Sequence, residues 1–228
     1  MKICFFNDYT LGVLNGDQVV DMSEHVKDIP MVGPHDLMNG LIENFDKYRS
    51  IFEHESTHGT GVPLNSVRFR APLPRPVNID CMAVNYMESG TKKEKSPING
   101  FLKASNSVIG PGETMVCQDI PATIFEGEAE LGVVMGKRTY QISEDDAMDN
   151  VFGYVNFIDG SARGLPPSGN VFLQMKARET FSPLGPYIVT KDEIEDPQNL
   201  DVKLWVNGDL KQDFNTDDMA HSIKTCIS

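Results

Sequence analysis

The sequence predicts an α+β fold that is mostly β. Residues 128–135 largely alternate between polar or small and apolar side chains, and residues 151–158 form a predominantly apolar run. Both patterns are typical of strands. Asn-Gly dipeptides at residues 15–16 and 207–208 indicate hairpin turns between neighbouring strands. Helical spacing of apolar residues is clear over residues 35–52, so helices form the smaller part of the fold.

The first part of the chain reads as a small mixed module. Short strands are expected over residues 2–6 and 18–22, on either side of the first Asn-Gly turn. The expected helix at 35–52 has Pro34 near its start, where proline is tolerated. Residues 67–70 alternate like an edge strand, which the following prolines end.

These patterns predict a domain boundary near residue 71. Residues 1–71 would form a small N-terminal αβ domain, and residues 72–228 a second, strand-rich domain. An amphipathic helical pattern begins at residue 217 and stops just before Ser228. This ending favours a second domain that lacks its C-terminal portion, with a naturally short helix as the alternative. The elements expected in the second part are strands at 79–84, 101–103, 128–135 and 151–158, a short helix capped by Ser143, and a hairpin over 202–214.

Composition limits the partners and the location. The formal net charge of −13 argues against nucleic acid and against an anionic membrane surface, because both require basic surface. The four cysteines are widely spaced, which is typical of reduced thiols in a cytosolic protein. No apolar stretch is long enough to span a bilayer. We therefore predict a cytoplasmic protein without a membrane or nucleic-acid partner.

Three carboxylates are candidates for a metal site. Glu128 and Glu130 lie two residues apart in a predicted strand, so both side chains share one face with Cα atoms about 7 Å apart. Asp159 is expected to end the strand at 151–158, where Gly160-Ser161 indicates a sharp exit. A solvated sheet face and a turn-stabilising aspartate are the alternatives. Oxygen ligands alone suit Mg²⁺, Mn²⁺ or Ca²⁺ and disfavour structural zinc.

From about Pro72 to its end the sequence resembles the fumarylacetoacetate hydrolase family. The motifs are short, but their order and spacing together are specific. Those that carry the resemblance are Asn85-Tyr86, Phe101-Leu102-Lys103, Gly110-Pro111-Gly112, Glu128-Ala129-Glu130-Leu131, Asp159-Gly160-Ser161-Ala162-Arg163, Lys176 with Thr180-Phe181-Ser182-Pro183-Leu184-Gly185-Pro186, and the Asn207-Gly208 hairpin leading to Asn215-Thr216-Asp217-Asp218-Met219.

The resemblance implies a mixed β-roll catalytic domain of the fumarylacetoacetate hydrolase type behind the small N-terminal domain, in a homodimer. It implies a bound Mg²⁺ or Mn²⁺ and a small keto or diketo acid as substrate. The site residues that it implies are Glu128, Glu130 and Asp159 as metal ligands, Lys176 as the active-site lysine, and Arg163, Thr180 and Tyr86 as substrate-binding residues.

The reaction expected first is hydrolysis of a C–C bond in an acylpyruvate or related diketo acid, through a metal-stabilised enolate. A decarboxylase or isomerase acting on a small keto acid at the same metal is the close alternative. A degenerate member that binds metal and keto acid without turnover is the third.

The sequence departs from the family pattern at the expected acid–base pair. Ser89 and Lys92 stand where the family commonly has a histidine and a glutamate on a lid. Without a positioned base, activation of water loses about 10²–10⁴-fold, which makes the decarboxylase or isomerase more attractive. Gly164 replaces an aspartate, and the loop at 165–169 that follows it is expected to shape the pocket.

Overall fold

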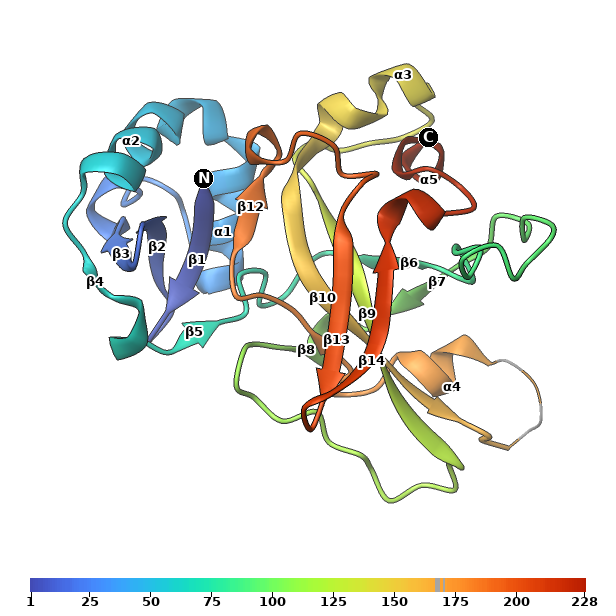
Figure 1. The fold of residues 1–228 in the computed structure, drawn as a ribbon. Helices are drawn as coiled ribbons and strands as arrows, with labels where there is room; N and C mark the ends of the chain where they lie inside the picture. The colour runs from blue at the N-terminus through green and yellow to red at the C-terminus, as the bar shows by residue number, and fades with distance from the viewer. Residues whose placement is uncertain (167–168, 170) are drawn as a thin grey trace.

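The computed structural model describes residues 1–166, 169 and 171–228. Its centre is one sheet in the order β4-β3-β2-β1-β12-β10-β9, with β5 paired to β1 (Figure 1). The fold is therefore α+β and mostly β, as the sequence predicts. The strands of this sheet are β1 (Lys2–Phe6), β2 (Thr10–Asn15), β3 (Gln18–Asp21), β4 (Val62–Pro63), β5 (Phe69–Arg70), β9 (Ile124–Met135), β10 (Val151–Arg163) and β12 (Ile188–Thr190).

Smaller pairs of strands and short helices surround this sheet. β6 (Ile79–Met82) pairs with β7 (Gly100–Lys103), β8 (Val108–Ile109) with β11 (Ser182–Pro183), and β13 (Asp201–Val206) with β14 (Asp209–Asn215). The helices are α1 (Pro34–Glu43), α2 (Phe45–His58), α3 (Glu144–Ala147), α4 (Phe172–Lys176) and α5 (Ile223–Ile227). Within the described residues, no helix has the length and apolar character that crossing a membrane requires.

The single helix expected over residues 35–52 is two helices. α1 ends at Glu43 and α2 begins at Phe45, with Asn44 between them at a non-helical φ of −117°. The Asn44 side chain donates a hydrogen bond to the carbonyl of Gly40, a local bond that competes with helix continuation. The apolar stripe continues across the break because both helices pack on the same core.

The sheet crosses the boundary expected at residue 71. β12 pairs with β1 on one side, with Ile3 opposite Ile188, and with β10 on the other. The ring of Phe45 also packs edge-on against Phe152, with ring centroids 4.9 Å apart. The division into two domains stays a prediction, and the two parts share one sheet and one apolar core.

β9 and β10 form the long antiparallel pair that carries the carboxylates. The expectation that the strand ends at Asp159 is wrong, because β10 continues to Arg163, which lies opposite Ile124. Gly160 stays extended, and its N–H donates to the carbonyl of Phe181 at 2.9 Å, so a neighbouring segment holds β10 straight there. Asp159 therefore sits inside a strand, where the pleat fixes the direction of its side chain.

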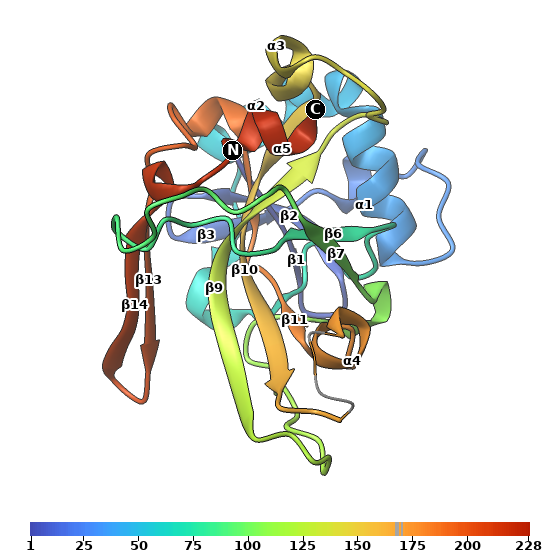
Figure 2. The ribbon, with the colours of Figure 1, turned by 90° about the vertical axis from the view of Figure 1, so that its right-hand side faces the viewer.

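The second Asn-Gly dipeptide forms the predicted hairpin turn. Val206 pairs with Asp209 across Asn207 and Gly208, whose φ angles are 53° and 88°. Positive φ at both central residues is the requirement of a type I′ turn, which Asn-Gly meets. The resulting β13–β14 hairpin lies beside β9 and β10 and projects away from the N-terminal helices (Figure 2).

Candidate active site

The β9–β10 register brings the three predicted metal ligands together. Glu128 lies directly opposite Asp159, and Glu130 lies opposite Phe157, two residues along from Asp159. Directly opposed residues have Cβ atoms about 4.5–5.5 Å apart, and diagonal neighbours lie about 7–8 Å apart. All three carboxylates therefore share one face of the same two strands.

Lys176 stands between two of these carboxylates. Its Nζ is 2.5 Å from Glu128 Oε2 and also donates to Asp159 Oδ2. α4 carries Lys176, and the stacking of Phe172 on Phe101, with centroids 4.7 Å apart, holds α4 against β7. The ammonium also lies 5.3 Å from the centroid of the Phe101 ring. These contacts give the predicted active-site lysine a fixed, buried position at the carboxylates.

Lys103 is a further residue of the site, which the sequence indicates only as part of the Phe101-Leu102-Lys103 motif. Its Nζ is 2.5 Å from Asp159 Oδ1 and 3.0 Å from the carbonyl of Gly160. The Lys103 side chain is fully buried, and burial lowers its pKa against the opposing charge of Asp159. The position of Lys103 at the end of a short predicted strand gave no sign that it would reach Asp159.

The two glutamates differ in their electrostatic surroundings. Glu128 accepts hydrogen bonds from Ser161, Arg163 and Lys176. Burial alone would raise the pKa of Glu128, but Lys176, Ser161 and Arg163 together outweigh burial, and the net shift of the pKa is downwards. Burial, with the charges of Asp159 and Glu128, raises the pKa of Glu130 to about 8. Among the described residues, no side chain forms an ion pair or hydrogen bond with the Glu130 carboxylate.

This donor set fits a divalent cation. Three carboxylates on one face are hard oxygen ligands, and one of them has no partner among the described residues. In the described part of the chain, no three ligand side chains already converge as a metal site. The Lys176 ammonium bonds both Glu128 and Asp159 and so lies between them, where a cation would bind. Glu128, Glu130 and Asp159 are the residues that would hold Mg²⁺ or Mn²⁺.

Arg163 lies at the end of β10 next to the carboxylates. Its guanidinium donates to Glu126 Oε2 and, at 2.8 Å, to Glu128 Oε1. The hydrogen bond from Arg163 to Glu126 and the two negative charges raise the arginine pKa further. The structure therefore brings this predicted substrate-binding residue to the edge of the cluster, where it is about one-third exposed.

Tyr86 and Thr180 take different positions. The Tyr86 ring packs edge-on against Phe214 at 4.8 Å, and burial together with the charge of nearby Glu130 raises its pKa. Thr180 has a φ of +68°, a strained backbone for a β-branched residue, and its Oγ1 accepts a hydrogen bond from the N–H of Val116 at 2.9 Å. Tyr86 thus lies close to the carboxylates, whereas Thr180 has no hydrogen bond to them within the described residues.

The expected lid is docked on the C-terminal segment. The N–H of Ser89 donates to Asp218 Oδ2 at 3.0 Å, and Asn85 exchanges two hydrogen bonds of 2.9 Å with the backbone of His221. Lys92 pairs with Glu88 at 2.7 Å. The backbone of Ser89 thus docks the segment, and Lys92 pairs within it. Of the loop expected to shape the pocket, residues 167 and 168 lie outside the described residues.

Gln212 on β14 supports β9 between the two glutamates. Its side-chain Oε1 accepts a hydrogen bond from the N–H of Ala129 at 2.7 Å, on the outer edge of β9. Replacing Gln212 by alanine leaves this N–H without its partner, so we expect a loss of about 1–2 kcal/mol in the free energy of unfolding. Urea unfolding measures it. Asp213→Ala, a change of an exposed neighbour, is the control and is expected to stay within about 0.5 kcal/mol.

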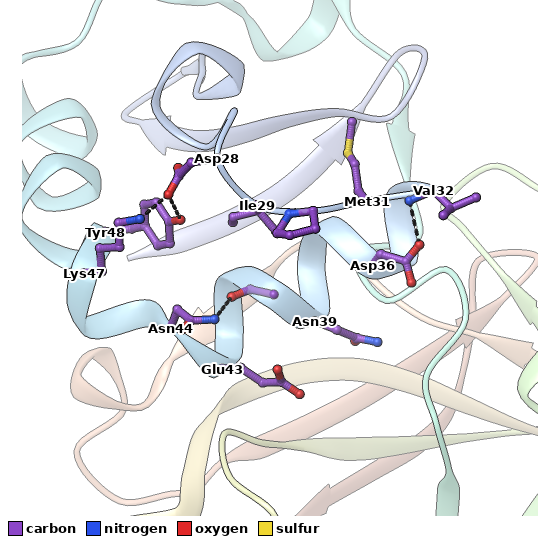
Figure 3. Close-up of a pocket in the computed structure, with 12 residues that line it drawn as sticks. Asp28, Ile29, Met31, Val32, Asp36, Asn39, Glu43, Asn44, Lys47 and Tyr48 are labelled. Atoms are coloured by element: carbon purple, nitrogen blue, oxygen red, sulfur yellow. Dashed lines mark hydrogen bonds and ion pairs between the residues drawn. The ribbon is translucent and has the colours of Figure 1, made fainter.

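A separate pocket of about 650 Å³ lies in the N-terminal part (Figure 3). Asp28, Ile29 and Val32 line it together with residues of α1 and the start of α2. None of the carboxylates of β9 and β10 contributes to it. Asp28 is already paired with Lys47 and Tyr48, and Asp36 accepts from the backbone of Val32. These two acidic groups thus serve local structure.

Comparison with known proteins identifies the family. The family described as fumarylacetoacetate (FAA) hydrolase C-terminal matches residues 78–228. The chain is 38% identical over 170 residues to oxaloacetate tautomerase fahd2, mitochondrial, of Xenopus laevis, covering 72% of this chain and 53% of that protein. It is 30% identical over 243 residues to maleylpyruvate hydrolase of Aquipseudomonas alcaligenes, covering 100% of this chain and 83% of that protein. The chain thus spans about half the length of the tautomerase.

A solved structure supports the same assignment. Maleylpyruvate hydrolase from Sphingobium sp. SYK-6, in complex with manganese(II) ion and pyruvate, superposes with a TM-score of 0.87 at 34% identity. The superposition covers 100% of this chain and 81% of that one. Sequence and fold therefore agree along the whole of β9, β10 and the segments around them. This chain belongs to the fumarylacetoacetate hydrolase family.

Proposed function

We propose that this chain acts, with a divalent cation, as a hydrolase that cleaves a C–C bond in an acylpyruvate or related diketo acid. The observation that carries the proposal is the set of three carboxylates on one face of β9 and β10 with a buried lysine between them. A pyruvoyl group presents two neighbouring oxygens that a hard cation prefers. The maleylpyruvate hydrolases among its relatives support this reaction class.

The residues would divide the work as follows. Glu128, Glu130 and Asp159 would hold Mg²⁺ or Mn²⁺, which supplies Lewis-acid polarisation of the substrate carbonyl when bound. Lys176, released from the carboxylates, donates a hydrogen bond where negative charge develops on a substrate oxygen. Arg163 binds the substrate carboxylate through its planar guanidinium. These roles are assigned from the positions described above, and Tyr86, held protonated, completes the polar wall with a phenol donor.

Tautomerisation of a small keto acid is the second candidate. The lid observation favours it over hydrolysis, because Ser89 and Lys92 stand where the expected acid–base pair would activate water. Tautomerisation does not require an activated water, but it still moves a proton between carbon and oxygen, and Lys176 is the group at the carboxylates that can carry this proton. The relative from Xenopus laevis, named an oxaloacetate tautomerase, supports this alternative.

A substrate panel separates the candidates. Acylpyruvates and oxaloacetate are supplied with Mn²⁺, and pyruvate release is followed by a coupled dehydrogenase while enol loss is followed by ultraviolet absorbance. Pyruvate from an acylpyruvate indicates hydrolysis, and enol loss from oxaloacetate without pyruvate indicates tautomerisation. Pyruvate from oxaloacetate indicates decarboxylation. Bound Mn²⁺ with no turnover of any substrate would contradict both proposed activities and indicate a degenerate member.

Replacing Ser89 by histidine tests the missing base. If the lid lacks only that group, Ser89→His is expected to raise acylpyruvate hydrolysis at least tenfold, a partial recovery of the about 10²–10⁴-fold that a well-positioned base contributes. Initial rates at saturating Mn²⁺ measure the effect. Ser89→Gln is the matched control, since it adds bulk without a titrating ring, and an equal gain in both variants would contradict the explanation.

We also propose that the protein is a cytoplasmic homodimer, as family resemblance suggests. Light scattering of the purified chain tests the assembly, with twice the mass of 25.3 kDa expected.

A further inference from the structure

The Lys103–Asp159 pair is the most deeply buried part of the acidic site. The side chain of Lys103 is 0% exposed and that of Asp159 is 2% exposed. A buried ammonium is tolerated only when its charge and donors are matched, and Asp159 Oδ1 and the Gly160 carbonyl provide that match. Lys103 has no part in the proposed chemistry, because its side chain is fully buried and its hydrogen bonds go to Asp159 and to the backbone of β10.

The two oxygens of Asp159 are held in different ways. Oδ1 accepts from Lys103, whereas Oδ2 accepts from Lys176, which also bonds Glu128. Within the described residues Lys103 bonds neither glutamate. A cation held by Glu128 and Asp159 together would take the place of the Lys176 ammonium, which bonds both, and not that of Lys103, which bonds only Asp159. Asp159 would then offer the cation Oδ2, while Oδ1 stays hydrogen-bonded to Lys103.

We propose that Lys103 is a positioning residue that limits Asp159 to one metal-binding oxygen and so favours Mg²⁺ or Mn²⁺ over Ca²⁺. The inference rests on the proposed function of the carboxylates. Mg²⁺ requires near-octahedral geometry at short distances, and Mn²⁺ shares its preference for octahedral oxygen sites. Ca²⁺ takes six to eight oxygens and readily uses both oxygens of one carboxylate. Holding Oδ1 on a buried ammonium removes the second oxygen that Ca²⁺ would use.

The test compares metal affinities of Lys103→Met with those of the unaltered full chain. Titration calorimetry measures Kd for Mn²⁺ and for Ca²⁺, and the quantity of interest is their ratio. Removing one positive charge strengthens the binding of both divalent ions alike. A change in the ratio of the two Kd values therefore reports the coordination geometry and not the change in charge. The preference for Mn²⁺ over Ca²⁺ is expected to fall about tenfold, a change of the size that outer-shell partners typically have on metal affinity.

Lys203→Met is the matched control, because it removes an exposed lysine from β13 and should leave the ratio unchanged. A folded Lys103→Met variant with an unchanged ratio would overturn the inference. If that variant fails to fold, a crystal structure of the unaltered chain with Mn²⁺ shows whether Asp159 binds the ion through one oxygen or two. We expect Asp159 to bind through one oxygen while Lys103 Nζ keeps its hydrogen bond to the other. Bidentate Asp159, or a displaced Lys103, overturns the inference.

The same experiments keep the two proposals apart. An unaltered chain that does not bind Mn²⁺ through Asp159 contradicts the proposed function itself. Binding through Asp159 with no change of ratio in Lys103→Met contradicts only the role of Lys103.

Discussion

Asp159→Asn is expected to destabilise the metal-free protein by about 3–5 kcal/mol, the cost of removing one partner from a buried ion pair. Lys103 and Lys176 are 0% and 6% exposed and both pair with this carboxylate, so its neutralisation leaves two buried ammonium groups without their common counter-ion. For a chain of this size the melting temperature should fall by about 6–20 °C. Differential scanning calorimetry of metal-free protein measures the change.

The same substitution is expected to abolish Mn²⁺ binding, which electron paramagnetic resonance of free Mn²⁺ measures. Asp213→Asn is the matched control. Its carboxylate pairs with Lys203 at 3.6 Å on the exposed hairpin, and loss of such a pair costs about 0–1 kcal/mol. Retained Mn²⁺ affinity in Asp159→Asn would remove Asp159 from the proposed ligand set, even if the protein were destabilised.

Lys176→Met is expected to separate metal binding from catalysis. We expect kcat/KM to fall about 10²–10³-fold, the usual effect of losing one donor to developing negative charge. The affinity for Mn²⁺ should hold or increase, because the ammonium that competes for Glu128 and Asp159 is gone. Steady-state kinetics and titration calorimetry on one preparation measure the two quantities.

Opposite changes in these two quantities are the signature of a lysine that alternates between the carboxylates and the substrate. A parallel loss of metal affinity and activity would instead indicate that Lys176 only supports the carboxylates. Lys211→Met provides the control for loss of one positive charge, since this residue pairs with Asp209 on the exposed turn of the hairpin. We expect neither quantity to change in that variant.

The parts of the site that follow from local geometry could be predicted from the sequence. Alternation places Glu128 and Glu130 on one face in any strand, whatever packs around it. The same holds for the turn at Asn207-Gly208, because its backbone preference is intrinsic to the two residues. The helix break at Asn44 escaped prediction because the apolar stripe keeps its period through it.

The parts that depend on distant segments could not be predicted. Gly160-Ser161 suits a turn as well as a strand, and only the hydrogen bond from Gly160 to Phe181 decides for the strand. Lys103 reaches Asp159 because β7 packs beside α4, which itself packs on β10, and no local pattern of polar and apolar residues encodes these contacts. The placement of Tyr86 near Glu130 likewise depends on its packing against Phe214.

The shared sheet also sets the order in which the protein can fold. β1 begins at residue 2, and its partner β12 begins at residue 188. The two strands can therefore pair only after most of the chain has been synthesised. Sheets that depend on such distant pairings fold slowly, because the loop must close before the contact stabilises it. During synthesis the edge of β1 that later receives β12 stays exposed, and this interval is when the chain is most open to aggregation.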